Sequence, residues 1–228
     1  ALARSGLSIK YKAFGRINLT DADMMRAMEE TGCVEIRFGI ESGSNRILEL
    51  TQKGFTAEQT VDVVRQATEI FRRADLFYVW GFPFETMEDF YQSIFQMVSF
   101  RMMGARILPS LLCLLPQTEI YRQHVDPAAL EFAPDVFPEY MITGHEVSRN
   151  AHIEIRPEHA DLFELVRAHP DIFPGFFHVD LENNIRPKLR VLQEFGFYPA
   201  SADELQMESC GAHSPKLNES QRQLATRA

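Results

Sequence analysis

Hydrophobic and polar residues alternate strictly over residues 33–41. The apolar positions are Val34, Ile36, Phe38 and Ile40, and the positions between them hold Glu35, Arg37, Gly39 and Glu41. Such alternation predicts a β-strand with one apolar face and one polar face. The next residues, Ser-Gly-Ser-Asn, form a turn sequence, so Glu41 is expected at the carboxyl end of the strand, just before a helix begins. In parallel α/β folds, ligands bind at that end of the sheet.

The polar face of this strand allows two interpretations. Carboxylates and a guanidinium on an inner face imply either buried ion pairs or a wet interior that holds a polar ligand. The alternative is an exposed edge strand whose solvated outer face carries the charges.

Strand and helix signals alternate over the first half of the chain. Strands are expected at 7–18, 33–41, 75–84 and 106–115, the last broken by Pro109. The helix signals are capping boxes at Thr20 with Asp23, Thr56 with Gln59 and Thr86 with Asp89, a Ser44 cap, and glycine stops at Gly32, Gly54 and Gly104. This alternation predicts an α/β fold with a parallel sheet and right-handed crossovers. Four strands are too few for a closed eight-stranded barrel, so we expect a partial (β/α) barrel or an open sheet.

The pattern changes after Gln123, where prolines, aromatic residues and acids mix. We divide the chain into a partial barrel at 1–123, a mostly helical and irregular C-terminal extension at 124–200, and a disordered tail at 201–228. Within the extension we expect an irregular loop with short helical turns at 126–140, a helix at 157–168, an aromatic loop at 169–178 and a helix at 185–195.

The composition limits the class of protein. A net charge of −9 over 228 residues argues against a general nucleic-acid binder, although one or two local cations could still hold a small anion. No apolar run is long enough for a membrane span and no signal peptide is present, so the cytoplasm is the expected location. The cysteines Cys33, Cys113 and Cys210 lie far apart without a metal-binding spacing, so they predict no metal site. The chain opens on Ala1 without an initiating Met, which suggests a fragment or a processed chain.

Four short motifs follow one another in an order and spacing that we know from one family. They are Arg-Phe-Gly-Ile-Glu-Ser-Gly-Ser at 37–44, Lys-Gly-Phe-Thr at 53–56, Gly-Phe-Pro-Phe-Glu-Thr at 81–86 and Leu-Pro-Gln-Thr at 115–118. On these motifs the chain resembles the later part of the radical S-adenosylmethionine (SAM) barrel, in the branch often fused to a cobalamin-binding domain. The resemblance covers roughly the first half of the chain, and the combination is more specific than any one motif.

The resemblance implies a cofactor site at the carboxyl ends of the strands. The residues that would bind S-adenosylmethionine are Gly39, Glu41, Ser42, Lys53, Val79, Gly81 and Leu115. Glu41 would accept hydrogen bonds from the ribose hydroxyls, Lys53 would meet the methionine carboxylate, and the strand face with Val79 and Gly81 would lie against the adenine. We weigh these roles against simpler ones: Glu41 as the ion-pair partner of Arg37 or Lys53, and Gly81 as a tightly packed strand end.

Other residues receive structural roles or weaker assignments. Glu85 is expected to orient the start of a helix rather than touch the cofactor. Arg16 is a further candidate for the cofactor cavity. His178 is the best candidate for a ligand contact among the histidines, although a hydrogen-bonded structural role is favoured. Phe84 and Gln117 stand where the family usually has glycine, which makes both turns bulkier.

The chain lacks the CxxxCxxC loop whose three thiolates hold the [4Fe-4S] cluster of the family. The resemblance therefore implies cluster ligands upstream, a reductant such as flavodoxin or ferredoxin, and reductive cleavage of S-adenosylmethionine to a 5′-deoxyadenosyl radical that modifies an unknown substrate. Cobalamin is a second cofactor to test. No catalytic residue, metal ligand, nucleic-acid partner or membrane partner is assigned within the chain, which should be catalytically silent alone.

Three functions remain open at this point. The first is the S-adenosylmethionine-binding portion of a radical SAM enzyme. The second is a non-catalytic relic or interaction module that keeps the half-barrel shape. The third is an unrelated parallel α/β enzyme that binds another nucleotide, which would call for a phosphate-cradling loop such as GxGxxG, and the sequence has none.

Overall fold

The computed structural model describes residues 9–133, 136–138, 150–151 and 157–198. Contacts divide the chain into one unit at Ala1–Tyr198 and a second at Pro199–Ala228, and every described residue belongs to the first. The tail expected to be disordered from 201 onward lies outside the described residues. Among the described residues, no helix combines the length and apolar character needed to cross a membrane.

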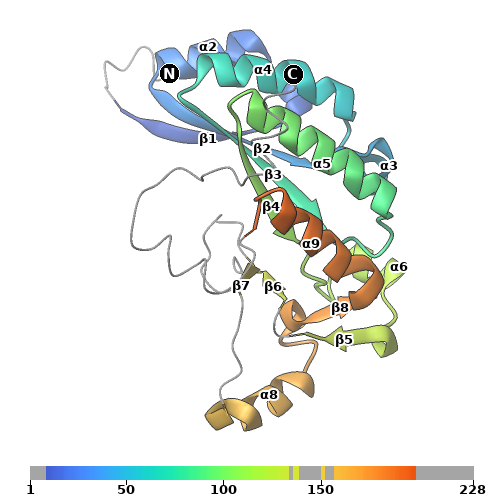
Figure 1. Ribbon diagram of the computed structural model, residues 1–228. Helices are drawn as coiled ribbons and strands as arrows, with labels where there is room; N and C mark the ends of the chain where they lie inside the picture. Colours follow the sequence, from blue (N-terminus) through green and yellow to red (C-terminus); the bar gives the residue numbers. More distant parts are fainter. Residues whose placement is uncertain (1–8, 134–135, 139–149, 152–156, 199–228) are drawn as a thin grey trace, which may run out of the picture. The chain divides into compact units, whose positions relative to one another are not determined.

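A four-stranded parallel sheet forms the centre of this unit (Figure 1). Its strands, in spatial as well as sequence order, are β1 (Tyr11–Gly15), β2 (Cys33–Glu41), β3 (Arg73–Trp80) and β4 (Arg106–Leu111). The predicted α/β class with a parallel sheet is therefore confirmed. The edge-strand interpretation of 33–41 is wrong, because β2 pairs with β1 on one side and with β3 on the other.

Three helices cover one face of the sheet (Figure 1). These are α2 (Ala22–Glu30), α4 (Ala57–Ile70) and α5 (Met87–Met102), and a short helix α3 (Asn45–Leu50) follows β2. Strands in sequential order with their helices on one face form the wall of a barrel, whereas a doubly wound sheet carries helices on both faces. The arrangement thus agrees with a partial barrel.

Local capping explains where the helices begin. Thr56 and Thr86 open α4 and α5 with the predicted capping boxes, and Ser44 caps α3. At α2 the predicted cap is wrong: the carboxylate of Asp21, not the hydroxyl of Thr20, accepts the Met24 N–H at 2.8 Å. Asp21 directly precedes the helix, where an acceptor reaches the free N–H groups of the first turn.

The strand boundaries differ from the predicted ones for local reasons. β3 ends at Trp80, because Gly81 takes φ = 85° and turns the chain out of the strand. β4 ends at Leu111, and Pro109 is tolerated within it because β4 lies at the edge of the sheet. The first strand is shorter than expected, since a 3₁₀ turn, η1 (Ile17–Leu19), follows β1.

The two faces of the sheet differ as the alternation predicted. Ile36, Phe38 and Ile40 of β2 are fully buried in the core, and burying such a side chain contributes about 1.5–3 kcal/mol. Alternate positions on β2, β3 and β4 carry the charged residues Glu35, Arg37, Arg73, Asp75 and Arg106. Apolar packing against the helices therefore fixes the orientation of the polar face.

The extension after β4 contains short strands that the sequence did not reveal. β5 (Leu130–Phe132) pairs with β8 (Phe177–Val179), and β6 (Phe137–Pro138) pairs with β7 (Asn150–Ala151). The expected loops at 126–140 and 169–178 are thus partly wrong, because a two- or three-residue strand has no periodicity that can be recognised locally. The remaining described elements are α6 (Glu119–His124), η2 (Pro127–Ala129), η3 (Pro157–His159), α8 (Ala160–Arg167), η4 (Pro174–Phe176), η5 (Leu181–Ile185) and α9 (Arg186–Glu194).

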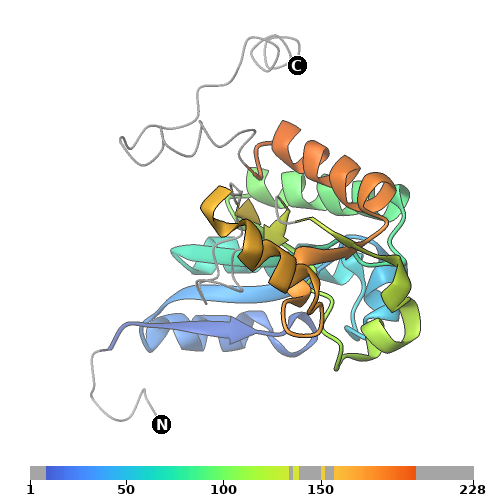
Figure 2. The ribbon, with the colours of Figure 1, turned by 90° about the horizontal axis from the view of Figure 1, so that it is seen from below.

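The last helix of the extension returns to the sheet domain. α9 lies beside α5, as both views show (Figure 1 and Figure 2). Arg101 of α5 donates hydrogen bonds to the carbonyls of Phe195 and Gly196 at 3.2 and 3.3 Å. The chain therefore brings residues 181–198 back to the part that carries the predicted motifs.

Candidate functional site

Glu41 occupies an unusual backbone position at the carboxyl end of β2. Gly39 pairs with Phe77 and Glu41 pairs with Tyr78, so Ile40 is an extra residue in the ladder, a β-bulge. Glu41 has φ = 70°, the left-handed region that side chains other than glycine rarely adopt. Bulges and strained residues of this kind are concentrated at functional sites, where they redirect a side chain.

Among the described residues, the Glu41 carboxylate faces one cation. Its Oε1 accepts a hydrogen bond from Lys53 Nζ at 2.8 Å, and the two side chains are 22% and 25% exposed. A Cβ on Gly39 would lie 2.7 Å from Glu41 Oε1 and 3.7 Å from Lys53 Nζ. A side chain at position 39 would therefore displace the Glu41 carboxylate from its present position, and the two charges remain partly accessible to solvent.

The loop that carries Lys53 is tied to the strand before it. Arg16 Nη2 donates to the Lys53 carbonyl, and Asn18 Nδ2 donates to the Gly54 carbonyl, each at 3.3 Å. Arg16 thus reaches the predicted site, but through the backbone of Lys53. The carboxyl ends of β1 and β2 and the 53–54 loop form one polar cluster.

Ser42 contacts the helix layer. Its side chain is fully buried, and its Oγ lies 2.9 Å from Ser93 Oγ on α5. Gly43 packs against the same helix so closely that a Cβ there would lie 2.6 Å from the Gln92 carbonyl oxygen. A direct cofactor contact for Ser42 stays a prediction, whereas its packing role is plain.

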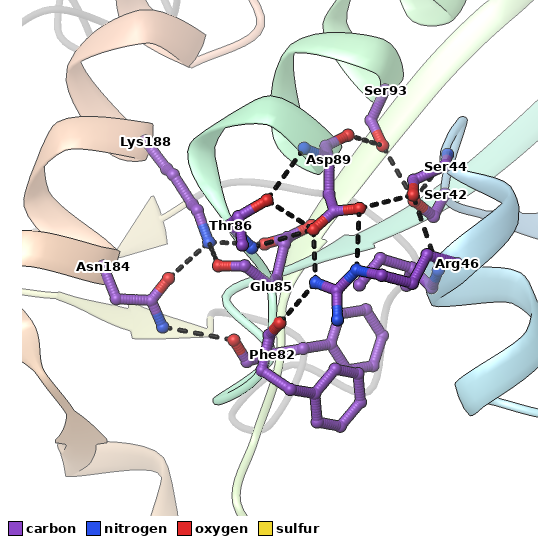
Figure 3. Close-up of polar contacts among 12 residues, drawn as sticks. Ser42, Ser44, Arg46, Phe82, Glu85, Thr86, Asp89, Ser93, Asn184 and Lys188 are labelled. Atoms are coloured by element: carbon purple, nitrogen blue, oxygen red, sulfur yellow. Dashed lines mark hydrogen bonds and ion pairs between the residues drawn. The ribbon is translucent and has the colours of Figure 1, made fainter.

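Asp89 joins two of the sequence motifs (Figure 3). Its carboxylate accepts hydrogen bonds from Ser44 Oγ at 2.6 Å, from Thr86 N at 3.0 Å, and from the Arg46 guanidinium. Arg46 also donates to the Phe84 carbonyl at 2.6 Å. Burial alone would raise the pKa of Asp89, but these donors outweigh it and hold the pKa well below its usual range. The network fixes the loop after β2 to the start of α5.

The 81–85 turn after β3 lies next to the end of β2. Gly81 N–H donates to Glu85 Oε2 at 2.9 Å, which closes the turn. A Cβ on Gly81 would lie 2.9 Å from Leu111 Cδ1 and 3.0 Å from Ile185 Cδ1, so side chains fill that space. Phe84, the bulky residue in this turn, stacks on Phe82 at a centroid distance of 5.5 Å. The turn is thus tightly packed on the side of the extension.

The other predicted site residues are partly exposed. Val79 is half-buried on β3 opposite Ser110. Leu115 is half-buried in the loop after β4, where its carbonyl accepts the Thr118 hydroxyl at 2.8 Å. The register of β2 and β3 places the ends of both strands side by side, as the cofactor interpretation requires.

Sequence reasoning missed Lys188 on α9. Its ammonium donates to Glu85 Oε2 at 2.7 Å, so Glu85 holds the turn and the extension together instead of only orienting the helix start. Leu181, Ile185, Lys188 and Leu192 recur at spacings of four, three and four residues, the pattern of a buried helix stripe. A lysine within such an apolar stripe was the sequence signal that could have indicated a buried cation at position 188.

The amino ends of the strands carry a second charge cluster. Glu35 and Asp75 are 5% and 1% exposed, and the cations around them are Lys12, Arg37, Arg73 and Arg106 at 2.6–4.0 Å. Burial opposes ionisation of Glu35, but hydrogen bonds from Arg37 and Lys12 prevail and lower its pKa. Burial raises the pKa of Asp75. Arg37 therefore pairs with acids at this end, and Lys53 is the partner of Glu41.

The thiols and histidines of the described residues do not form a metal site. Cys33 and Cys113 are buried, and burial raises the pKa of Cys113 to about 11. No group of three or more His, Cys, Asp and Glu side chains in the described ranges is placed to hold a metal ion. His178 is buried with Nε2 2.7 Å from the Val136 carbonyl oxygen, consistent with the favoured structural role.

A hollow of about 1020 Å³ is lined mainly by α4 and α5, with Gly43 at its border. It is formed by α4 and α5 on the outer side of the helix layer, and Val61, Tyr91, Phe95 and Met103 are among its apolar lining residues. None of the predicted cofactor-binding residues lines this hollow. The candidate site is therefore the group of residues at the carboxyl ends of β2 and β3.

Two curated relatives match limited segments of the chain, and no protein-family model matches it. An uncharacterized methyltransferase of Pyrococcus horikoshii is 40% identical over 88 residues, 39% of this chain and 19% of that protein. A tRNA-2-methylthio-N(6)-dimethylallyladenosine synthase of Buchnera aphidicola is 36% identical over 58 residues, 25% of this chain and 13% of that protein. The matched segments thus span about a fifth and about an eighth of the two relatives. Both relatives are enzymes by name.

Solved structures with a partial likeness include radical SAM enzymes. A cobalamin-dependent S-adenosylmethionine radical enzyme, OxsB, with aqua-cobalamin bound has a TM-score of 0.38 and 19% identity, over 42% of this chain and 15% of that chain. Coproporphyrinogen III oxidase (HemN) of Escherichia coli, described as a radical SAM enzyme, has a TM-score of 0.44 and 14% identity, over 52% of this chain and 27% of that chain. At these scores neither likeness carries an argument about what this chain binds.

Proposed function

We propose that the carboxyl ends of β2 and β3 bind S-adenosylmethionine, and that the chain is the cofactor-binding portion of a radical SAM enzyme. The observation that carries the proposal is the position of Glu41. A carboxylate stands on a left-handed backbone at a bulge, beside a glycine that leaves space for it and opposite one accessible ammonium. The motif resemblance and the methyltransferase relative support the choice of ligand.

The residues fit the two polar ends of this ligand. The Glu41 carboxylate has lone pairs for two ribose hydroxyls, and Lys53 provides a cation for the carboxylate of the methionine part. Binding would replace the internal Glu41–Lys53 contact with contacts to the ligand. The two side chains keep partial access to water, so the same atoms can exchange this contact for contacts of the same kind with the ligand.

The described residues do not fit a [4Fe-4S] cluster. The cysteines of the chain lie far apart in sequence, and Cys33 and Cys113 are buried thiols. In the proposed enzyme, the cluster ligands and the reductive chemistry therefore come from outside these residues, with a reductant protein such as flavodoxin or ferredoxin. We also propose that the enzyme is cytoplasmic and acts on a substrate that is not identified. Cobalamin is proposed as a second cofactor to test.

A non-catalytic interaction module is the second candidate. Two observations favour it: Glu41 already has a partner in Lys53, and Leu111 and Ile185 fill the space beside Gly81. This alternative predicts that the chain binds no S-adenosylmethionine.

Isothermal calorimetry of the chain with S-adenosylmethionine separates the two candidates. Wild-type protein should bind, and Glu41→Gln should weaken binding about 10- to 100-fold, the loss expected for charge-assisted hydrogen bonds. Glu69→Gln is the matched control, because Glu69 is an exposed acid paired with Arg65 at 3.8 Å, far from the site in sequence. Equal affinity of wild type and Glu41→Gln, or no binding by wild type, would contradict the proposal.

A further inference from the structure

Lys188 is a buried cation whose donors are all used. Its side chain is 1% exposed, and Nζ donates to Glu85 Oε2 at 2.7 Å, to the Glu85 carbonyl at 2.9 Å and to Asn184 Oδ1 (Figure 3). An ammonium has three N–H groups, so this site satisfies each of them. The contacts join α9 and η5 to a turn about a hundred residues earlier in the chain.

Burying the Lys188–Glu85 ion pair carries a desolvation cost that apolar packing of the helix would avoid. Burial lowers the pKa of Lys188 and raises that of Glu85, because both charged forms lose water. Glu85 Oε1 is buried without a hydrogen-bond partner among the described residues. Apolar side chains of similar volume often stabilise such positions as well or better. The pair therefore calls for a role besides stability, and its contacts indicate one.

The contacts of the pair converge on backbone groups of the 81–85 turn. Glu85 Oε2 accepts the Gly81 N–H at 2.9 Å, Lys188 binds the Glu85 carbonyl, and Asn184 Nδ2 donates to the Phe82 carbonyl at 3.2 Å. Hydrogen bonds at three points define the path of so short a turn. Gly81, which needs its positive φ, lies at the start of this path.

Two further contacts place the extension against the same strand end. Ile185 fills the space that a side chain at Gly81 would need. Tyr198 accepts the Trp80 indole N–H at 3.1 Å and donates to the Pro109 carbonyl at 2.8 Å. The extension thus contacts β3, its turn and β4 close to their carboxyl ends.

We propose that residues 181–198 are a positioning element of the ligand site, and that Lys188 is its central positioning residue. Lys188 acts through Glu85 and Asn184 on the 81–85 turn and does not itself touch ligand. The inference rests on the proposed function, in which this turn borders the adenine of S-adenosylmethionine. It assigns a role to a part of the chain that carries no recognised motif.

The test uses the full chain and three variants. Lys188→Met leaves Glu85 buried and unpaired, and Glu85→Gln/Lys188→Met removes both charges so that folding is restored. Arg190→Met is the matched control, because Arg190 is an exposed cation on the same helix. Hydrogen exchange at 81–85 and calorimetry with S-adenosylmethionine and with 5′-deoxyadenosine are measured below each thermal midpoint.

The double variant distinguishes positioning from stability. We expect its thermal midpoint to recover toward wild type, while exchange at 81–85 stays faster than in wild type and affinity for both ligands stays about tenfold weaker, a loss typical of supporting residues. The control should match wild type in all three measurements.

Each other outcome decides a separate point. Unchanged exchange at 81–85 in both Lys188 variants would overturn the positioning role. Faster exchange with wild-type affinity would show that the turn does not border the ligand, which also overturns it. Failure of wild type to bind either ligand would reject the proposed function and with it the role of Lys188 in binding, whereas loss of binding in the Lys188 variants alone would leave the proposed function intact.

Discussion

The two ends of the polar sheet face use similar residues in different ways. At the amino end, two buried acids lie among four basic side chains. At the carboxyl end, one acid, Glu41, meets one base, Lys53, and both are about a quarter exposed. Of these three acids, Glu41 alone has a left-handed backbone conformation, although the β1–β2 register also shifts just before Glu35.

The difference shows how charges that stabilise the sheet can be distinguished from charges that can bind a ligand. Buried acids with several cations have no lone pair or solvent path to offer a ligand, so their pairing serves the sheet. A partly exposed pair with one mutual contact can exchange partners more easily than a buried network of charges. The type of residue is the same at both ends, and exposure, number of partners and backbone conformation decide its use.

The largest expected effect is at the amino end. Asp75→Ala removes the charge-assisted hydrogen bonds that this buried carboxylate accepts from Arg73 and Arg106, so we expect a loss of about 3 kcal/mol in the free energy of unfolding, measured with urea. Asp62→Ala, at an exposed pair with Arg65, should leave the free energy of unfolding nearly unchanged. A loss at Asp75 as small as that of the control would mean that the amino-end cluster is not structural.

Asp89→Asn should show the next effect, about 2 kcal/mol at neutral pH, from charge-assisted hydrogen bonds and a helix cap. The folded pKa of Asp89 is depressed, so its stabilisation is present above its ordinary pKa of about 3.9 and is lost as pH falls toward the folded value. As the pH is lowered below about 5, the urea concentration at the unfolding midpoint should therefore decrease for wild type. It should decrease less for Asp89→Asn. Parallel pH profiles would contradict the depressed pKa, and Asp23→Asn, at an exposed acid, provides the control.

The strain at Glu41 should appear as a difference between two variants. Glu41→Gly and Glu41→Ala both remove the carboxylate, but only glycine accepts φ = 70° without cost. We expect the glycine variant to be more stable by about 1 kcal/mol in urea unfolding. Equal stabilities would show that the backbone at the bulge stores no strain.

The smallest effect on stability is expected for Lys53→Met. The partly exposed pair with Glu41 should be worth about 1 kcal/mol or less. In calorimetry the variant should bind S-adenosylmethionine more weakly and 5′-deoxyadenosine normally, because Lys53 is assigned to the methionine carboxylate. A loss of about 2 kcal/mol in stability would place this pair with the structural charges of the amino end.

Local signals in the sequence predicted much of the sheet domain. The alternation in β2, the capping boxes at Thr56 and Thr86 and the stop at Gly32 each depend on neighbours within a few residues, so they can be recognised without the fold. The same signals brought Glu41 to a strand end beside the end of β3, as the register confirms. The domain boundary near residue 124 and all the cofactor roles stay predictions, namely those of Gly39, Glu41, Ser42, Lys53, Val79, Gly81 and Leu115.

Contacts between distant segments could not be predicted. Glu85 and Lys188 are 103 residues apart, and nothing near Glu85 indicates a buried cation. The strands β5 and β8 are defined only by each other, across more than forty residues. The bulge at Glu41 arises from pairing with β3 and leaves no mark in the alternation of β2.

Trp80 is the only tryptophan of the chain, and its indole N–H is bound by Tyr198 at the end of the extension. Its fluorescence therefore comes from a single place, the junction between β3 and the C-terminal segment. Undocking of that segment would expose the indole to water and shift its fluorescence emission to longer wavelength. The fluorescence of the unlabelled protein should thus report whether α9 and the residues after it are docked on β3.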